Sequence, residues 1–188
     1  GTTLIRIALI SWLACVCVAC QRSDNEAVTI VPSPPQTQAD AAPGDPFAPS
    51  SSAYSKLCEV TEGALATPWD GRLESFAPWL EGQTVAVERS LALLRALRVG
   101  AQDVYAVANG RVALVYEQIA IAMTEATPLA EAAGDDSDWK GQQARIWEQA
   151  YGFFARCARL CGLAGAHLDA WDLRCSEGRA NSQAKLAR

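Results

Sequence analysis

The residues of this chain best suited to chemistry are its seven cysteines and its one histidine, His167. Three cysteines lie within the first twenty residues, and the other four are spread over the rest of the chain: Cys58, Cys157, Cys161 and Cys175. Thiolates are soft ligands that suit Cu(I) and Zn²⁺, and two thiols can also be oxidised to a disulfide. The available chemistry is therefore disulfide formation, metal binding or thiol redox exchange.

Disulfides are the chemistry that we expect of the four later cysteines. An even number of cysteines favours disulfides in a chain exported from the cytoplasm. Cys157 and Cys161 are one helical turn apart with parallel side chains, which is a poor geometry for bonding each other. We predict that Cys161 bonds Cys175 and that Cys58 bonds Cys157, each contributing about 3 to 4 kcal/mol. The swapped arrangement, Cys157 with Cys175 and Cys58 with Cys161, is a close alternative.

A metal or redox site is the alternative use of these thiols. Cys157 and Cys161, with His167 near them in the sequence, could hold Cu(I) or Zn²⁺. Their Cys-x-x-x-Cys spacing resembles the repeated pairs of helical copper-storage proteins, with one pair present here. A thiol-redox enzyme would carry Cys-x-x-Cys at a helix start after a strand, and that motif is missing. Because an oxidising compartment and an even number of cysteines both favour disulfides over a metal site, we expect no metal ion and no cofactor.

Other side chains give little support for catalysis. A histidine-dependent triad or metal motif would rest on His167 alone, which we expect at a helix start near the surface. The acidic loop 135–138 lacks the glycine and the distal glutamate of a calcium loop, so its carboxylates are expected to cap a helix. Glu117 and Glu125 would be acid-base candidates if they were buried, but a small rotation of their helix would expose them. We expect a protein that is not an enzyme.

The elements that must position these residues are helices, because apolar residues after residue 52 recur three and four apart. Long helices are predicted along the apolar stripes within 77–94, 108–126 and 146–164, and shorter ones at 54–65 and 167–175. Pro128 is expected to end the second long helix, and Gly100 with Asp103 to separate it from the first. The fold class predicted is all-α, a small antiparallel bundle of four to five helices over residues 54–176, with the helix through 108–126 at its centre.

Tryptophans outside the N-terminal segment fall near the predicted helix ends and loops, and we expect them to fill the ends of the bundle. An exposed pair among them could instead form a platform for a sugar or a partner protein. The five residues are Trp69, Trp79, Trp139, Trp147 and Trp171.

The segments on either side of the predicted bundle differ from it in composition. Between residues 21 and 52 the chain has six prolines among small and polar residues. Such a segment cannot bury enough apolar surface to offset the entropy of ordering it, and proline keeps it extended. We expect residues 21–53 to be a disordered tether and residues 177–188 to be a disordered C-terminal tail.

Residues 1–20 have the features of an export signal. Arg6 is their one charged residue, and an apolar run at 7–14 precedes small residues and a cysteine. The apolar run is shorter than the about 20 residues that a membrane-spanning helix needs, and the chain becomes polar directly after Cys20. Residues 1–20 are therefore predicted to be a signal peptide that is removed after export.

The end of this segment resembles the lipobox of bacterial lipoproteins, on the four residues Cys-Val-Ala-Cys that end at Cys20. The resemblance implies that Cys20 is lipidated and becomes the new N-terminus, and Leu-Ala-Cys ending at Cys15 is a competing site. It also implies sorting to the outer membrane, because Gln21 rather than aspartate follows the lipidated cysteine. The partner implied is a membrane, held through an N-terminal lipid anchor.

The charge of the chain argues against nucleic acid as a partner. Without residues 1–20 the chain has 15 basic and 21 acidic residues, a net charge of −6. Its basic residues are interleaved with acidic ones, whereas phosphate backbones are bound by clustered lysine and arginine. We expect a non-catalytic, lipid-anchored protein of the cell envelope, facing the periplasm or the cell surface. Its helical domain would bind an envelope protein or act as a scaffold, and the alternative is a cysteine-based copper, zinc or redox protein.

Overall fold

The computed structural model describes residues 43–44, 46–47, 52–135 and 137–187. The described residues all belong to one compact unit of the chain, residues 37–188. The predicted signal peptide at 1–20, with Cys15 and Cys20, and the tether up to residue 42 lie outside them. Among the described helices, none combines the length and the apolarity that a membrane span requires.

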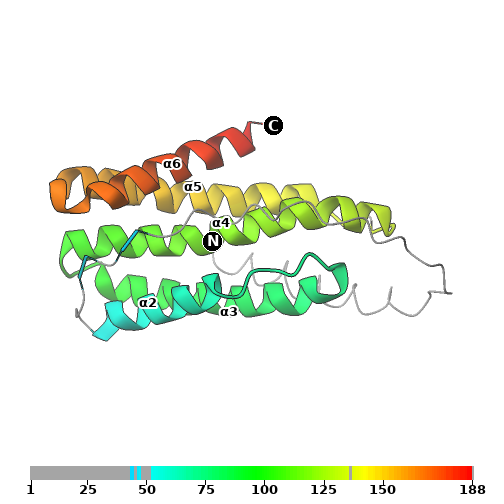
Figure 1. The fold of residues 1–188 in the computed structure, drawn as a ribbon, viewed down its shortest axis with the longest axis horizontal. Helices are drawn as coiled ribbons and strands as arrows, with labels where there is room; N and C mark the ends of the chain where they lie inside the picture. The colour runs from blue at the N-terminus through cyan, green and yellow to red at the C-terminus, as the bar shows by residue number, and fades with distance from the viewer. Residues whose placement is uncertain (1–42, 45, 48–51, 136, 188) are drawn as a thin grey trace. The chain divides into compact units, whose positions relative to one another are not determined.

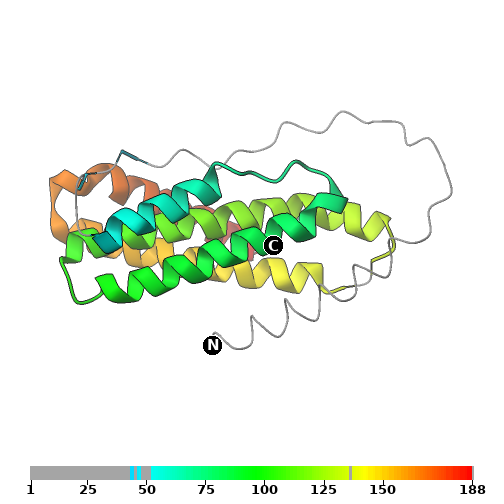
Figure 2. The same ribbon diagram turned by 90° about the horizontal axis from the view of Figure 1, so that it is seen from below.

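The described part of this unit is helical, which confirms the predicted all-α class. It contains five α-helices and a short 3-10 turn, and no strand occurs in the described ranges. In Figures 1 and 2, α4 lies between the pair α2 and α3 on one side and the pair α5 and α6 on the other. The elements in order are α2 (Ser52–Leu65), α3 (Leu73–Leu97), α4 (Gln102–Ala132), α5 (Trp139–Ala164), η1 (Ala166–Leu168) and α6 (Asp169–Leu186).

Helix α4 forms the centre of the bundle, as its sequence predicted. Every residue from Ala106 to Glu117 is buried, so this stretch has no solvent-exposed face. The helix packs against α2, α3, α5 and α6. Small residues allow these close approaches: a Cβ atom on Gly110 would lie 2.8 Å from the ring of Trp171 and 2.9 Å from the sulfur of Cys157. The apolar character of α4 on all sides thus reflects contact with four neighbouring helices.

The prediction that Pro128 ends this helix is wrong, because α4 continues to Ala132. Proline lacks the N–H that would bond the carbonyl four residues earlier, so it removes one backbone hydrogen bond there. The following turn is still closed by the backbone N–H of Ala133, which donates to the carbonyls of Leu129 and Ala130. At the start of α5 the predicted capping is confirmed, since a carboxylate oxygen of Asp138 accepts from the N–H of Gly141 at 2.9 Å.

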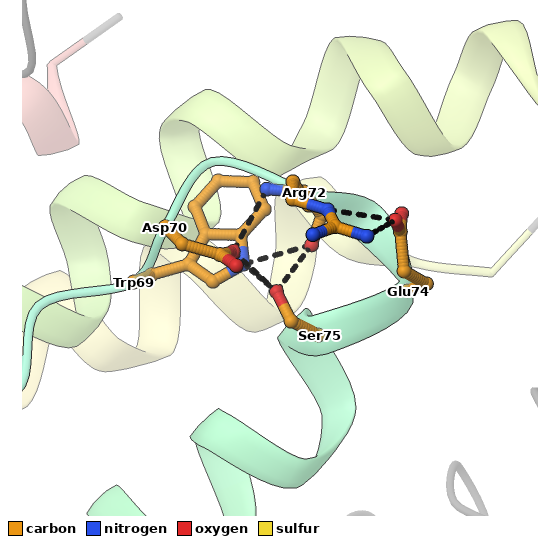
Figure 3. Close-up of polar contacts among 5 residues, drawn as sticks. All are labelled: Trp69, Asp70, Arg72, Glu74 and Ser75. Atoms are coloured by element: carbon orange, nitrogen blue, oxygen red, sulfur yellow. Dashed lines mark hydrogen bonds and ion pairs between the residues drawn. The ribbon is translucent and has the colours of Figure 1, made fainter.

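The turn between α2 and α3 is held by a small polar cluster (Figure 3). Asp70 accepts hydrogen bonds from the backbone N–H of Arg72 and from the hydroxyl of Ser75. Trp69 donates its indole N–H to the carbonyl of Arg72 at 3.0 Å, and the Arg72 guanidinium pairs with Glu74. The hydrogen bond from Ser75 lowers the pKa of the Asp70 carboxyl. These contacts set where α3 begins, and the cluster is best explained as a helix-start structure.

Both predicted boundaries of the helical domain need correction. The expected tail at 177–188 is helical as far as Leu186, because Gly178 and Ser182 lie on a buried face of α6. Small residues do not form an apolar stripe, so hydrophobic periodicity missed this part of the helix. At the other end, Gly44 and Phe47 of the expected tether contact the domain: the Gly44 carbonyl accepts from the indole N–H of Trp171 at 3.2 Å, and the Phe47 ring packs edge-on against Tyr54.

The contact of Gly178 with α5 gives a testable prediction about stability. A Cβ atom there would lie 2.5 Å from the ring of Phe154, which is fully buried. Alanine at this position gains about 1 kcal/mol of helix propensity, but overpacking costs about 1–3 kcal/mol and has little room to relax. We therefore expect Gly178→Ala to lower the free energy of unfolding measured in urea.

The matched control is Gly152→Ala, in the middle of α5, where a Cβ atom would have nothing within 4 Å. This variant should be more stable than the wild type by about 0.5–1 kcal/mol, because alanine restricts the unfolded chain more than glycine does. Equal stabilisation by both substitutions would contradict the tight packing of α6 on α5.

Candidate functional site

Three of the four later cysteines lie together between α5 and α6. Cys157 and Cys175 form a disulfide that joins the two helices, with their Cα atoms 5.9 Å apart. The Cys161 sulfur lies one turn further along α5, 3.8 Å from the sulfur of Cys157. All three side chains are buried. This group, Cys157, Cys161 and Cys175, is called the sulfur cluster below.

The predicted pairs Cys161–Cys175 and Cys58–Cys157 are both wrong. Cys157 and Cys175 each lie nine residues from Ala166 in the turn η1, so the antiparallel hairpin brings them to the same level. Cys161 is four residues nearer to the turn than Cys157, so it is not level with Cys175. Cys58 is a buried thiol on α2, which packs against α3 and α4, while α5 lies against the other side of α4. The close alternative is therefore half realised: Cys157–Cys175 is present, and Cys58–Cys161 is not.

Cys161 is a free thiol with little tendency to ionise. Burial raises its pKa to about 11, and the carboxylate of Asp172 adds to the increase. Because the thiolate is the nucleophile in thiol exchange and the ligand in metal binding, the folded protein holds this group in its unreactive form at neutral pH. Within the described residues, no group of three or more histidine, cysteine, aspartate or glutamate side chains is arranged to hold a metal ion.

A buried ion pair lies between α4 and α6. Arg174 donates to the carboxylate of Glu117, and each side chain is only 6% exposed. The Arg174 guanidinium also lies over the ring of Phe154, 5.2 Å from its centroid. Its Nε and Nη1 atoms are buried and have no hydrogen-bond partner among the described residues. Glu117, whose orientation the sequence left open, thus connects the two helices, while Glu125 is half-buried.

A second buried arginine joins three helices. Arg111 of α4 donates to the hydroxyl of Tyr54 at 3.3 Å and to a carboxylate oxygen of Glu62 at 2.9 Å. Its guanidinium lies over the rings of Tyr54 on α2 and Trp171 on α6. Burial raises the pKa of Tyr54 well above its usual range, so this phenol stays protonated and keeps its hydrogen. The arrangement ties α2 and α6 to the central helix.

Two surface grooves formed by the described residues could receive a ligand. The first, called the arginine groove, lies between α5 and α6 and has a volume of about 590 Å³. Arg156 is held in place there by a hydrogen bond from Nη1 to the side-chain oxygen of Asn109. The groove is lined by Ala155, Arg156, Ala158, Arg159, Asp172, Ser176 and Arg179.

The second, called the α2–α3 groove, has a volume of about 530 Å³ and a largely apolar lining. Gly63 and Gly82 lie in it from opposite helices, and a Cβ atom on either would meet nothing within 4 Å. Trp79 contributes a partly open ring, and Val85 is 44% exposed. Gln83 also lines the groove: its side-chain N–H donates to the carbonyl of Ala64, and its side-chain oxygen is buried without a partner among the described residues. The remaining lining residues are Glu59, Val60, Ala64, Thr67, Pro78, Ala86 and Arg89.

The remaining candidate residues from the sequence have surface, capping or packing roles. His167 is 54% exposed in η1, and its Nε2 lies 3.7 Å from a carboxylate oxygen of Asp103, as expected for a surface residue at a helix start. Asp135 of the acidic loop accepts from the N–H of Ser137 and from the indole of Trp139. Trp79 is the one of the five tryptophans that is not buried. The other four are buried and fill the bundle: Trp69, Trp139, Trp147 and Trp171.

Sequence reasoning missed both grooves, although each had a weak signal. The arginine groove needs side chains that share one face on each of two helices. On α5, residues 156 and 159 have this helical spacing, and on α6 residues 172, 176 and 179 have it. Nothing in the sequence shows that these two faces meet. From the sequence, the glycines of the α2–α3 groove indicate only a low helix propensity at their positions. That they leave open space between two helices follows from the helix pairing.

Comparisons with known proteins add no relative for this arrangement. No family model matches the chain, and no curated protein or solved structure matches it significantly.

Proposed function

We propose that this chain is a non-catalytic binding module of the cell envelope, exported and held at a membrane by a lipid on Cys20. The module is the helical bundle, and its partner is another envelope protein that places an apolar segment in the α2–α3 groove. The membrane proposed is the outer membrane, with the bundle facing the periplasm or the cell surface.

The disulfide supports the export part of this proposal. Disulfides persist in oxidising compartments such as the periplasm and are rare in the reducing cytoplasm. The bond between Cys157 and Cys175 is buried and joins two helices of the bundle core, so it is a structural cross-link. It agrees with the export signal that the sequence predicts at residues 1–20.

The observation that carries the binding part is the make-up of the α2–α3 groove. Its lining is largely apolar and includes the Trp79 ring, and two residues of opposite charge, Glu59 and Arg89, also line it. Protein interfaces commonly combine an apolar centre containing an aromatic residue with a charged rim. The buried oxygen of Gln83 adds an acceptor that an N–H donor of a partner could satisfy if the two helices part slightly. These features favour a short apolar segment with a hydrogen-bond donor as the occupant.

The experiment that tests the groove fills it with a side chain. Gly82→Leu places four carbons in open space within the groove, and Gly152→Leu does the same on an exposed face of α5 outside it. Both are helical positions with room for a side chain, so both variants should fold. Cross-linking in cells should capture an envelope protein with the wild type and with Gly152→Leu, and at least about tenfold less of it with Gly82→Leu.

Binding of that purified partner to the purified bundle protein, again lost only in Gly82→Leu, completes the test. Capture that is unchanged by Gly82→Leu would refute the groove as the binding surface. An enzymatic turnover that depends on a residue of either groove would refute the non-catalytic proposal.

The sulfur cluster favours a second candidate function, a cysteine-based metal-binding or redox protein. Reduction of the Cys157–Cys175 bond would leave three thiols within one cluster, because the Cys161 sulfur already lies 3.8 Å from Cys157. Three thiolates in close proximity suit Cu(I) or Zn²⁺. This candidate requires that the protein works in its reduced form.

A count of thiols and metal in protein purified from the periplasm separates the two candidates. The binding module predicts two thiols, Cys58 and Cys161, that react only after denaturation, and no bound metal. Non-reducing peptide mapping should then recover Cys157 joined to Cys175. Four reactive thiols together with stoichiometric copper or zinc would support the second candidate instead.

A further inference from the structure

Basic and acidic residues are distributed unequally between the first three helices and the last two. Residues 139–187, which form α5, η1 and α6, have seven basic and four acidic residues, a net charge of +3 with His167 neutral. Residues 52–132, which form α2, α3 and α4, have six basic and ten acidic residues, a net charge of −4. The helices α5 and α6 thus have an excess of basic residues in an acidic protein, and the arginine groove lies between them.

The arginines of this groove form no ion pair with a carboxylate among the described residues. Arg159 and Arg179 are exposed, and within the described part of the chain neither lies within 4 Å of a carboxylate oxygen. Arg156 is oriented by its hydrogen bond to Asn109. Arginine presents a planar fork of donors that matches the oxygens of phosphate, so guanidiniums that line one groove without carboxylate partners form a suitable anion site.

The helical spacing on α6 locates the anion within the groove. Asp172, Ser176 and Arg179 are four and three residues apart, so they follow one face of α6. Asp172 would repel an anion, and it lies at the end of the groove that is nearer to the turn. Because Cys157 is level with Cys175 in the antiparallel hairpin, Arg159 is level with residue 173, and Ser176 lies midway between that level and Arg179. The anion is therefore best placed at the Ser176 hydroxyl, where the long side chains of both arginines can reach it.

The groove is built on a rigid base. The Cys157–Cys175 bond joins its two helices, and the buried pair of Arg174 with Glu117 connects α6 to α4. A ligand therefore orders only the exposed arginine side chains, because the backbone that carries them is already fixed. Such preorganisation reduces the entropic cost of binding.

We propose that the arginine groove binds a phosphate group, through Arg159 and Arg179 with Ser176 as a further donor. A lipid headgroup and a soluble phosphate compound would present the same chemistry to this groove. The site is separate from the α2–α3 groove and lies on different helices.

Inorganic phosphate is the first probe, titrated into the full chain at low ionic strength and followed by NMR. We expect the side-chain N–H signals of Arg159 and Arg179 to shift. The affinity should fall at least about fivefold in the double variant Arg159→Gln/Arg179→Gln, because charge-assisted hydrogen bonds are lost. The control Arg145→Gln/Lys185→Gln makes the same change of net charge at exposed positions outside the groove, and should change the affinity less than about twofold.

Retention on lipid vesicles distinguishes a lipid headgroup from a soluble phosphate compound as the ligand. The wild type and both variants share the same N-terminus, so a difference between them reports on the groove alone. Weaker retention of the groove variant on phosphatidic acid vesicles, reversed by added phosphate, would support a lipid headgroup. Equal retention of all three proteins, together with groove-dependent phosphate binding, would support a soluble ligand. Absence of phosphate binding, or equal weakening in both double variants, would overturn the proposal.

Discussion

Glu117→Leu is expected to lower the free energy of unfolding by about 3–5 kcal/mol, the largest effect that we predict for one substitution in this protein. The Arg174 guanidinium would remain buried between α4 and α6 without its carboxylate partner. A buried charge that loses its partner costs far more than the intact pair contributes, because the desolvation of the remaining charge is no longer compensated. Urea unfolding followed by circular dichroism measures the change.

The double variant Glu117→Leu/Arg174→Met separates this effect from simple loss of packing. With both charges gone, the stability should return to that of the wild type or exceed it by about 1–4 kcal/mol. Arg174 supports the higher value, since its Nε and Nη1 atoms lack hydrogen-bond partners among the described residues and methionine needs none. If the double variant were as unstable as Glu117→Leu, packing rather than charge would be the cause.

Removal of the disulfide in Cys157→Ala/Cys175→Ala is expected to lower the free energy of unfolding by about 3 kcal/mol. The bond closes a loop with a sequence separation of 18 residues, and cross-links of that length restrict the unfolded chain by about this amount. Because small domains have only about 5–15 kcal/mol of stability in total, the loss should be evident as a large shift of the urea midpoint.

Two comparisons control this prediction. Addition of dithiothreitol should destabilise the wild type by a similar amount and leave the double variant unchanged. Cys161→Ala keeps the cross-link and should remain sensitive to the reductant. If reduction left the wild type as stable as before, the Cys157–Cys175 bond would have no role in holding α6 on α5.

The helices themselves follow from local features of the sequence. Apolar spacing located the interior of each helix, the carboxylate of Asp138 indicated the start of α5, and the apolar run around Val112 placed α4 at the centre. These features depend on residues within a few turns of each other, so the sequence shows them directly. The prediction was wrong where the buried face of a helix is made of small residues, as at Gly178 and Ser182 of α6.

The contacts between helices were decided by the tertiary structure. Which cysteine meets Cys175 depends on the level at which α6 passes α5, and the length of the turn sets that level. Whether Glu117 is buried with Arg174 or faces solvent depends on the rotation of α4 within the bundle. Both grooves depend on which helix faces meet.

The sequence by itself therefore determined the helical class, the order of the helices, the central place of α4 and the cysteines available for bonding. Only the tertiary structure decided the disulfide, the buried ion pairs and the two grooves. The physical reason is that helical periodicity is set by neighbours in the chain, whereas rotation and level are set by how side chains of distant segments pack together.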